Sequence, residues 1–293
     1  MRALIDRNLK LYFRDKVAVF FSLLTVLIVI VLYVLFLAQV QIDAIASASG
    51  GMISDDKIKA LINTWVLAGL LSITTVTSTL GGYATMVNDL EKKKLMDFKS
   101  SPMKQTYYPV AQFISAFLIG TIISLVALIG YGGYIHLSGI YTFSLSHILK
   151  CSGYILLSAL MNAALMGFFV SLLKTTSAYG NFSLVLGTII GFLNGLYVPV
   201  GLLPNAVQVI IKILPFGHIA ALLRQALASD AANACFAGLP EQVVLDYKEA
   251  YGILLYWGDK KIAPTVSVIF IVAVLVVSLI LFALNYRRKR SEI

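Results

Sequence analysis

Hydroxyl side chains recur on one face of an apolar segment of the chain. Ser72, Thr75 and Thr79 are three and four residues apart, so a helix would bring them to the same side. Hydroxyls in this arrangement can line a polar route for a substrate, and we name these three residues and Asn194 as candidate pathway residues. Serine and threonine in apolar helices also bond back to carbonyls of their own helix or let helices approach closely, and we favour that interpretation.

Asn162, Asn181 and Asn194 lie within apolar sequence. An amide without a partner is costly in such surroundings, so we expect these side chains to make hydrogen bonds between helices. Contact with a substrate is the less favoured alternative.

No set of residues in the sequence has the spacing of a catalytic or metal site. There is no HExxH motif, no pair of carboxylates in apolar sequence and no convincing GxSxG motif. His136, His147 and His218 are dispersed. Cys151 and Cys235 lack the spacing of a metal site, so we interpret them as packing residues. We expect this chain to have no enzyme activity and to bind no metal ion or cofactor directly.

The composition indicates which solvent surrounds these residues. Hydrophobic residues make up 59% of the chain and charged residues 13%, whereas soluble domains have about a quarter charged. Apolar runs of about 20 residues recur, as membrane-spanning helices require. A net charge of +9 would suggest nucleic acid in a soluble protein, but here the basic residues flank the apolar runs. That placement is typical of a membrane protein in contact with lipid, so we expect no nucleic-acid partner.

The expected fold class is an all-α membrane protein with one transmembrane domain over residues 1–293. The first apolar run is longer than the hydrophobic region of a signal peptide, so we expect it to be retained as a span. The six expected transmembrane helices are 17–40, 61–87, 110–137, 148–173, 179–200 and 265–286.

Residues 201–263 are expected to form a re-entrant extracellular hairpin followed by an extracellular loop. The stretch 202–227 is apolar, but Pro204, Pro215 and Gly217 divide it into pieces too short to cross a membrane alone. The stretch 228–263 is longer and more polar than a minimal loop, and it could be a substrate gate, a partner surface or a solvated loop.

Arg224 lies in the amphipathic piece LLRQAL. We interpret it as a side chain that snorkels to the membrane interface. The alternative is that Arg224 and Pro215 belong to an outer gate at the exit.

The positions of lysine and arginine orient the spans. The segments 1–16, 87–109 and 287–293 together with Lys174 hold 15 of the 23 basic residues, and the loops on the other side hold 8. Basic residues concentrate on the cytoplasmic side of membrane proteins. Both termini are therefore expected to be cytoplasmic in a multi-pass protein of a bacterial-type plasma membrane.

Residues 1–16 predict an interfacial helix. Apolar and basic residues each recur at helical spacing in the segment RNLKLYFRDK. We expect the apolar face, which includes Phe13, to lie along the cytoplasmic interface. The basic face, with Arg7 and Arg14, would point toward anionic lipid, and Asp15 follows at its end.

Residues 88–109, between the second and third spans, predict a structured cytoplasmic segment. Leu95 and Phe98 are three residues apart and can share a helix face, while Glu91 and the neighbouring lysines keep the rest hydrated. Ser101 followed by Pro102 is a favourable start for another short helix. Through such a segment, a motor subunit could exert force on the membrane domain. The residues assigned to this coupling role are Glu91, Leu95, Phe98, Ser101, Pro102 and Met103.

Taken in order, these features resemble the permease subunit of the type-2 ABC exporter superfamily. The resemblance rests on RNLKLYFRDK, on residues 91–102 with FKSSPMK at the end, and on GLYVPVGLLPNAVQVIIKILPFGHIAALLRQAL. It implies that these are a connecting helix, a coupling helix that docks in a groove of the ATPase subunit, and a re-entrant extracellular hairpin. The resemblance covers the whole chain, including the number and orientation of the spans.

The resemblance also implies partners, because the chain has no GxxxxGK[ST] phosphate loop and no cytoplasmic segment large enough for a nucleotide-binding domain. Two copies of a separate ABC ATPase, which bind ATP and magnesium, are expected. A second permease subunit, identical or homologous, would complete the translocation pathway. The cargo expected from the resemblance is a drug, antibiotic, peptide, lipid or glycan.

A cation-coupled secondary transporter is the alternative. The predicted spans have no ionisable residue at mid-membrane depth, which argues against proton coupling. Hydroxyl runs and interrupted helices can still coordinate a sodium ion, so that alternative stays open.

Gly187, Gly191 and Gly195 repeat every four residues on the fifth expected span. Small residues at this spacing predict close packing against a neighbouring helix, within the chain or across a dimer.

Overall fold

The computed structural model describes residues 1–17, 19–20, 27–28, 31, 33, 38–48, 52–94, 96 and 103–292. In this part of the chain the regular secondary structure is helical apart from one short antiparallel pair of strands. Its elements, in chain order, are α1 (Arg2–Arg14), α3 (Ala38–Ala48), α4 (Asp55–Gly82), α5 (Ala84–Glu91), α7 (Tyr107–Ala127), the π-helical turn η2 (Leu128–Gly132), α8 (Gly133–Leu137), α9 (Leu145–Leu172), α10 (Thr176–Leu193), the 3-10 turn η3 (Val200–Leu202), α11 (Asn205–Ile213), α12 (Pro215–Leu227), α13 (Ser229–Cys235), α14 (Glu241–Ala250), β1 (Tyr256–Trp257), β2 (Lys260–Lys261) and α15 (Pro264–Glu292).

Five helical stretches of the described part are long and apolar enough to cross a membrane, or six if α11 and α12 form one bent span. They confirm the predicted all-α membrane fold and match the second to sixth expected spans. Most of the expected first span, 17–40, lies outside the described residues. The five stretches are Asp55–Glu91, Tyr107–Leu137, Leu145–Leu172, Thr176–Leu193 and Pro264–Tyr286.

The fifth span is shorter than the predicted 179–200, because α10 ends at Leu193. Gly195 follows with φ of +60°, the left-handed conformation that commonly ends a helix. The predicted glycine stripe is therefore wrong for Gly195, which lies in a turn. An added Cβ at Gly191 would meet Tyr197 of that turn, and at Gly187 it would meet open space within the described part.

The apolar stretch 202–227 is divided into α11 and α12, whose axes are bent by 85°. Pro215 is the first residue of α12, where a missing N–H costs little. Proline also disfavours helical geometry in the residue before it, and Leu214 is extended with φ −85° and ψ 144°. The predicted break is confirmed, and its re-entrant course stays a prediction.

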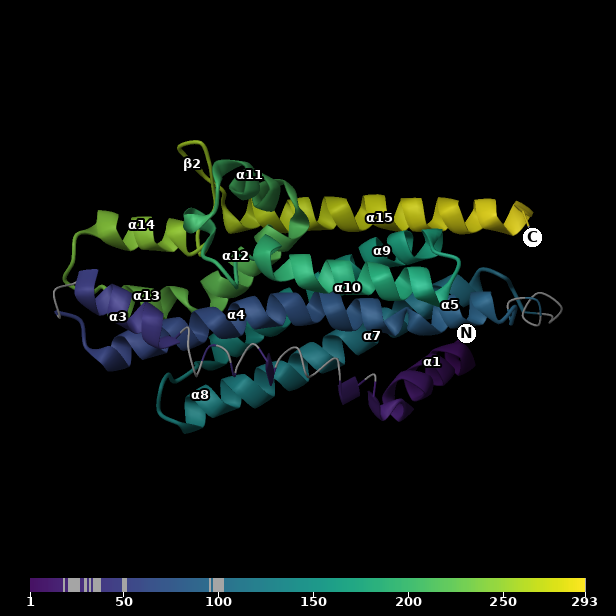
Figure 1. The fold of residues 1–293 in the computed structure, drawn as a ribbon, viewed down its shortest axis with the longest axis horizontal. Coiled ribbons are helices and arrows are strands. Elements are labelled where there is room, and N and C mark those ends of the chain that lie inside the picture. The colour runs from purple at the N-terminus through teal and green to yellow at the C-terminus, as the bar shows by residue number, and fades with distance from the viewer. Residues whose placement is uncertain are drawn as a thin grey trace.

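Helix α4 lies at the centre of the bundle, where it contacts α7, α9 and α12 (Figure 1). Glycines permit the closest approach to α7, because a Cβ at Gly82 would lie 2.8 Å from the backbone of Ala116. A Cβ at Gly120 would collide with Thr79 in the same interface. Helix α10 has the smallest share of buried residues among the candidate spans of the described part.

The stretch 228–263 is folded, and the alternative of a solvated loop is wrong. Helices α13 and α14 lie at the end of the molecule opposite the two chain termini (Figure 1). The rings of Tyr247 and Tyr251 stack with centroids 4.1 Å apart. The Tyr251 carbonyl accepts a hydrogen bond of 2.7 Å from the indole N–H of Trp65 on α4. The stretch is thereby fixed to the central helix.

Both cysteines belong to the apolar core. Cys151 and Cys235 are free thiols and are buried in the same hydrophobic cluster. Their interpretation as packing residues is confirmed.

Candidate functional site

A buried carboxylate joins three elements at the end of the molecule where the chain termini lie. Asp89 of α5 is 1% exposed and accepts two hydrogen bonds from the Arg7 guanidinium of α1, of 2.6 and 2.8 Å. The hydroxyl of Tyr108, on α7, donates a third of 3.2 Å. Two-point pairing of arginine with a carboxylate is strong and fixes the relative orientation of both groups. Asp89 therefore holds α1, α5 and α7 together.

Helix α1 packs against the bundle through Arg7 and Asn8. For Arg7 this differs from the sequence prediction. The bond to Asp89 raises the pKa of Arg7 above its ordinary value. Asn8 is buried and its amide donates to the hydroxyl of Ser115 on α7 at 3.3 Å. The prediction that Arg7 points toward lipid is therefore wrong. Phe13 and Arg14 are exposed at the end of α1, and Asp15 follows as its C-terminal cap.

The end of α5 is also tied to the fifth span. The carboxylate of Glu91 accepts a hydrogen bond of 2.6 Å from the hydroxyl of Thr176, at the start of α10. The backbone N–H of Thr176 lies 3.4 Å from the same oxygen. A carboxylate is favourable at this place because the first N–H groups of a helix have no partner inside it. A movement of the end of α5 would therefore reach α10 directly.

The predicted coupling residues lie at and beyond this connection. Glu91 is the last residue of α5, and Met103 is partly buried just before α7. The other four, Leu95, Phe98, Ser101 and Pro102, lie outside the described residues. Their coupling role stays a prediction.

The predicted pathway hydroxyls are buried between α4, α7 and α9. Thr75 donates to the carbonyl of Ser72 at 2.8 Å and lies 2.7 Å from the hydroxyl of Ser158 on α9. Thr79 donates to the carbonyl of Thr75 at 2.5 Å, and Asn162 donates to Ser158 and to Thr75. Bonding back to the same helix is thus confirmed for the two threonines. A role in a substrate route stays a prediction.

The other asparagines do not behave as expected. Asn181 is exposed on α10. The side chain of Asn194 is fully buried, and neither of its polar atoms has a partner among the described residues. The expected hydrogen bonds between helices are thus found for Asn162 alone of the three. The Asn194 backbone is nevertheless part of a second polar cluster.

Arg224 is the centre of that cluster, at the other end of the bundle. It is 1% exposed, so its interpretation as a snorkelling side chain is wrong. Its guanidinium donates to the carbonyls of Asn194 and Gly195, at 2.8 and 2.9 Å, and lies 4.7 Å from the centre of the Trp65 ring. Arg224 thereby joins α12, the end of α10 and α4. Pro215 is buried at the start of the same helix, and a gating role for the two residues stays a prediction.

Sequence reasoning missed Asp89 and Trp65 as members of these clusters. Asp89 could have been noticed as an acid at the end of an apolar run, where mainly lysines follow. Trp65 gives no such signal, because a tryptophan in an apolar segment is ordinary packing. In the described part of the chain, no group of three or more His, Cys, Asp or Glu side chains is arranged to hold a metal ion.

Comparison with known protein families identifies the following match. The family model of the ABC-2 type transporter matches residues 1–228, which covers all of the elements from α1 to α12. Searches of curated proteins and of solved structures found no match.

Proposed function

The chain belongs to the ABC-2 type transporter family, and from this membership we propose that it is the membrane-spanning subunit of an ATP-driven exporter. A separate ABC ATPase would supply the energy, docking on the segment 91–103. Two ATPase copies and a second permease subunit would complete the transporter. The cargo would be a drug, antibiotic, peptide, lipid or glycan.

The observation that carries the proposal is the double connection of α5. Asp89 ties this helix to α1 and α7, and Glu91 ties it to α10. The proposed docking segment follows immediately. A force on that segment would therefore move a connected group of helices rather than a single loop. Such a connection is required if closure of the ATPases is to open a translocation pathway between the helices.

The position of the termini supports the proposed orientation. Both chain ends lie at the end of the molecule where Asp89 and Glu91 are found (Figure 1). The excess of basic residues belongs to the same end, which is the cytoplasmic side by the positive-inside rule. The ATPase, the docking segment and both termini would then share one side of the membrane.

A second permease subunit has a candidate surface on α10. Leu184, Val185 and Ile189 of this helix are exposed in the single chain, with exposed fractions between 45% and 72%. We propose that the second subunit covers part of this face.

The test of the proposal is docking of the partner ATPase. Phe98→Ala and Leu95→Asp should reduce co-purification of the ATPase and transport, because both remove apolar contact area from the docking segment. Membrane insertion should be unchanged. Val243→Ala is the control, since it truncates an apolar side chain that is 42% exposed at the opposite end of the molecule. Normal co-purification and transport in both docking variants would disprove the assignment.

A further inference from the structure

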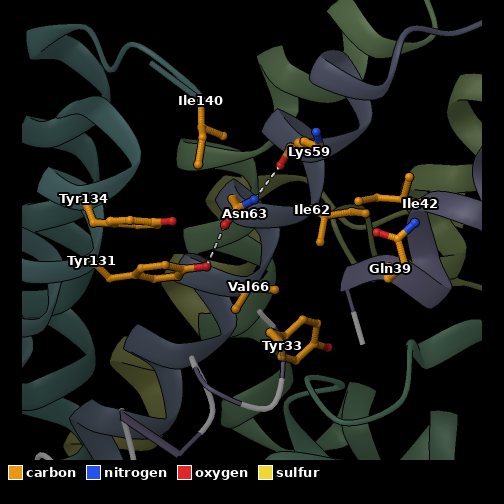
Figure 2. A pocket seen from close by; sticks show the side chains of 10 residues that line it. All are labelled: Tyr33, Gln39, Ile42, Lys59, Ile62, Asn63, Val66, Tyr131, Tyr134 and Ile140. Carbon is orange, nitrogen blue, oxygen red and sulfur yellow. Dashed lines mark hydrogen bonds between the residues drawn. The ribbon is translucent and has the colours of Figure 1, made fainter. Parts of the chain in front are cut away.

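A pocket of about 220 Å³ opens between α3, α4 and the α7–α8 stretch (Figure 2). It lies away from the Asp89 cluster, and the proposed coupling mechanism does not use it. The pocket is smaller than the roughly 300–1,000 Å³ of sites that enclose a drug-sized ligand. It could hold a headgroup or one end of a larger molecule.

Two tyrosines form one wall of the pocket. Tyr131 belongs to the π-helical turn η2 and Tyr134 to α8, and their rings stack with centroids 6.1 Å apart and planes 12° apart. The Tyr131 hydroxyl donates to the Asn63 side chain at 2.8 Å, and Asn63 donates to the carbonyl of Lys59 at 2.8 Å (Figure 2). This chain of bonds fixes the aromatic wall against α4. π-helical turns are rare in proteins, and those that occur are often found at functional sites.

The hydrogen-bond donors left over in the pocket favour an anion. Tyr134 is 49% exposed, and its hydroxyl, which points across the pocket in Figure 2, has no partner among the described residues. Lys59 is the one charged side chain among the described lining residues. The ion pairs of the described part involve Arg7, Lys94 and His147, so Lys59 is in none of them.

The wall opposite the tyrosines is mainly apolar, and its polar member is Gln39, whose amide NH2 group already donates to Asp43 at 2.9 Å (Figure 2). Ile42 of α3 faces the pocket together with Ile62 and Val66 of α4 (Figure 2). A ligand that interacts favourably with both walls must combine a negatively charged group with a hydrocarbon part. A small soluble anion would leave the apolar wall uncovered.

The position of the pocket in the fold further limits the class of ligand that it can bind. Lys59 is near the first residues of α4, and Tyr134 is near the last residues of α8, so both lie where spans leave the apolar layer. Tyrosine concentrates at both membrane interfaces, and a lysine near the end of a span extends its ammonium group to the level of the lipid headgroups. We propose that the pocket binds the phosphate headgroup of an anionic phospholipid, in the outer leaflet on the orientation given above.

The test compares lipid retention by the purified full-length permease in detergent, measured by native mass spectrometry. Phosphatidylglycerol and phosphatidylcholine are the probes, with Lys59→Gln as the variant. Lys57→Gln is the matched control, because Lys57 is an exposed lysine of the same helix that does not line the pocket. The loss of one charge-assisted contact at an exposed position should weaken retention of phosphatidylglycerol about three- to tenfold.

The expected result is that the fraction of chains retaining a phosphatidylglycerol falls about three- to tenfold in Lys59→Gln, with no change in Lys57→Gln and little retention of phosphatidylcholine. Tyr134→Phe should give a smaller loss of the same lipid. Equal phosphatidylglycerol retention in Lys59→Gln and the unaltered protein would overturn the proposal. Displacement of the lipid by an equal concentration of glycerol phosphate would overturn the lipid assignment in favour of a soluble organic phosphate. Because no ATPase is present, the outcome does not depend on the proposed export function.

Discussion

Arg224 carries a positive charge into the interior of the bundle, and among the described residues no carboxylate pairs with it. The positive charge of Arg224 is compensated instead by the partial charges of neighbouring polar and aromatic groups. The carbonyls of Asn194 and Gly195 belong to the end of α10, where unpaired carbonyls and the helix dipole are both negative. The face of the Trp65 ring adds a further attraction for the cation.

We predict that Arg224→Met destabilises the protein by about 1–3 kcal/mol, because two buried carbonyls lose their donor. Arg224→Lys should recover only part of this loss, since an ammonium group cannot bond to both carbonyls and also lie flat on the indole. Thermal unfolding of the detergent-solubilised protein measures the effect. Lys150→Met, at an exposed position of α9, is the control. An unfolding temperature of Arg224→Met equal to that of the control would contradict this account.

At the scale of elements, α4 and α7 approach closely because glycines replace side chains between them. Gly82 lies against the backbone of Ala116, where no rotation of a side chain can make room. Gly133, at the start of α8, has no atom within 4 Å of an added Cβ in the described structure. The two positions therefore separate the effect of packing from the effect of glycine on helix stability.

Gly82→Ala should destabilise the protein by about 1–3 kcal/mol, because the new methyl group overpacks the interface. Gly133→Ala should be neutral or stabilising by up to about 1 kcal/mol, since alanine favours the helix. Both changes are measured by thermal unfolding. Equal unfolding temperatures for the two variants would show that the α4–α7 interface can open at little cost.

The connection through α5 predicts a variant that docks its ATPase but does not transport. Asp89→Asn removes the charge that holds Arg7 and leaves Leu95 and Phe98 unaltered. Within the docking segment it affects only Lys94, whose ion pair with Asp89 is long, at 4.0 Å. Co-purification of the ATPase should stay normal, whereas transport should fall. Glu241→Gln, an exposed acid on α14, is the control. Full transport by Asp89→Asn would mean that the α1–α5 connection is not part of the coupling.

At the scale of the whole molecule, the orientation can be tested by labelling. In a background with Cys151→Ser and Cys235→Ser, a membrane-impermeant maleimide should label Asp259→Cys in intact cells. It should label Ser291→Cys only after permeabilisation, because the C-terminus is expected in the cytoplasm. The two positions control for each other, and the reverse pattern would invert the proposed topology.

The features that could be predicted from the sequence are those that depend on a local pattern of residues. The positions of five spans followed from their apolar runs, and the bend before α12 followed from Pro215. The contacts of Arg7 and Arg224 could not be predicted in this way, since Asp89 is 82 residues from Arg7 and Asn194 is 30 residues from Arg224. A basic residue on an amphipathic helix has the same local pattern whether it faces water, lipid or a buried carbonyl. Only the packing of α4 and α10 against α12, and of α5 and α7 against α1, decides between them.

The π-helical turn η2 gives the pocket a dependence on chain length. A π-helical turn accommodates one residue more than an α-helical turn, and one residue of α-helix corresponds to a rotation of about 100°. Residues after Gly132 therefore point in a different direction from the one that a continuous α-helix would give them. Deleting Gly130, an exposed position with open space around it, would remove the extra residue and convert η2 into an α-helical turn. A chain shortened in this way would keep its third span and its aromatic wall, because the π-helical turn already absorbs the extra residue and its removal leaves Tyr134 in nearly the same direction. Deleting one residue of α7 instead, with η2 retained, would rotate Tyr134 by about 100° away from Lys59.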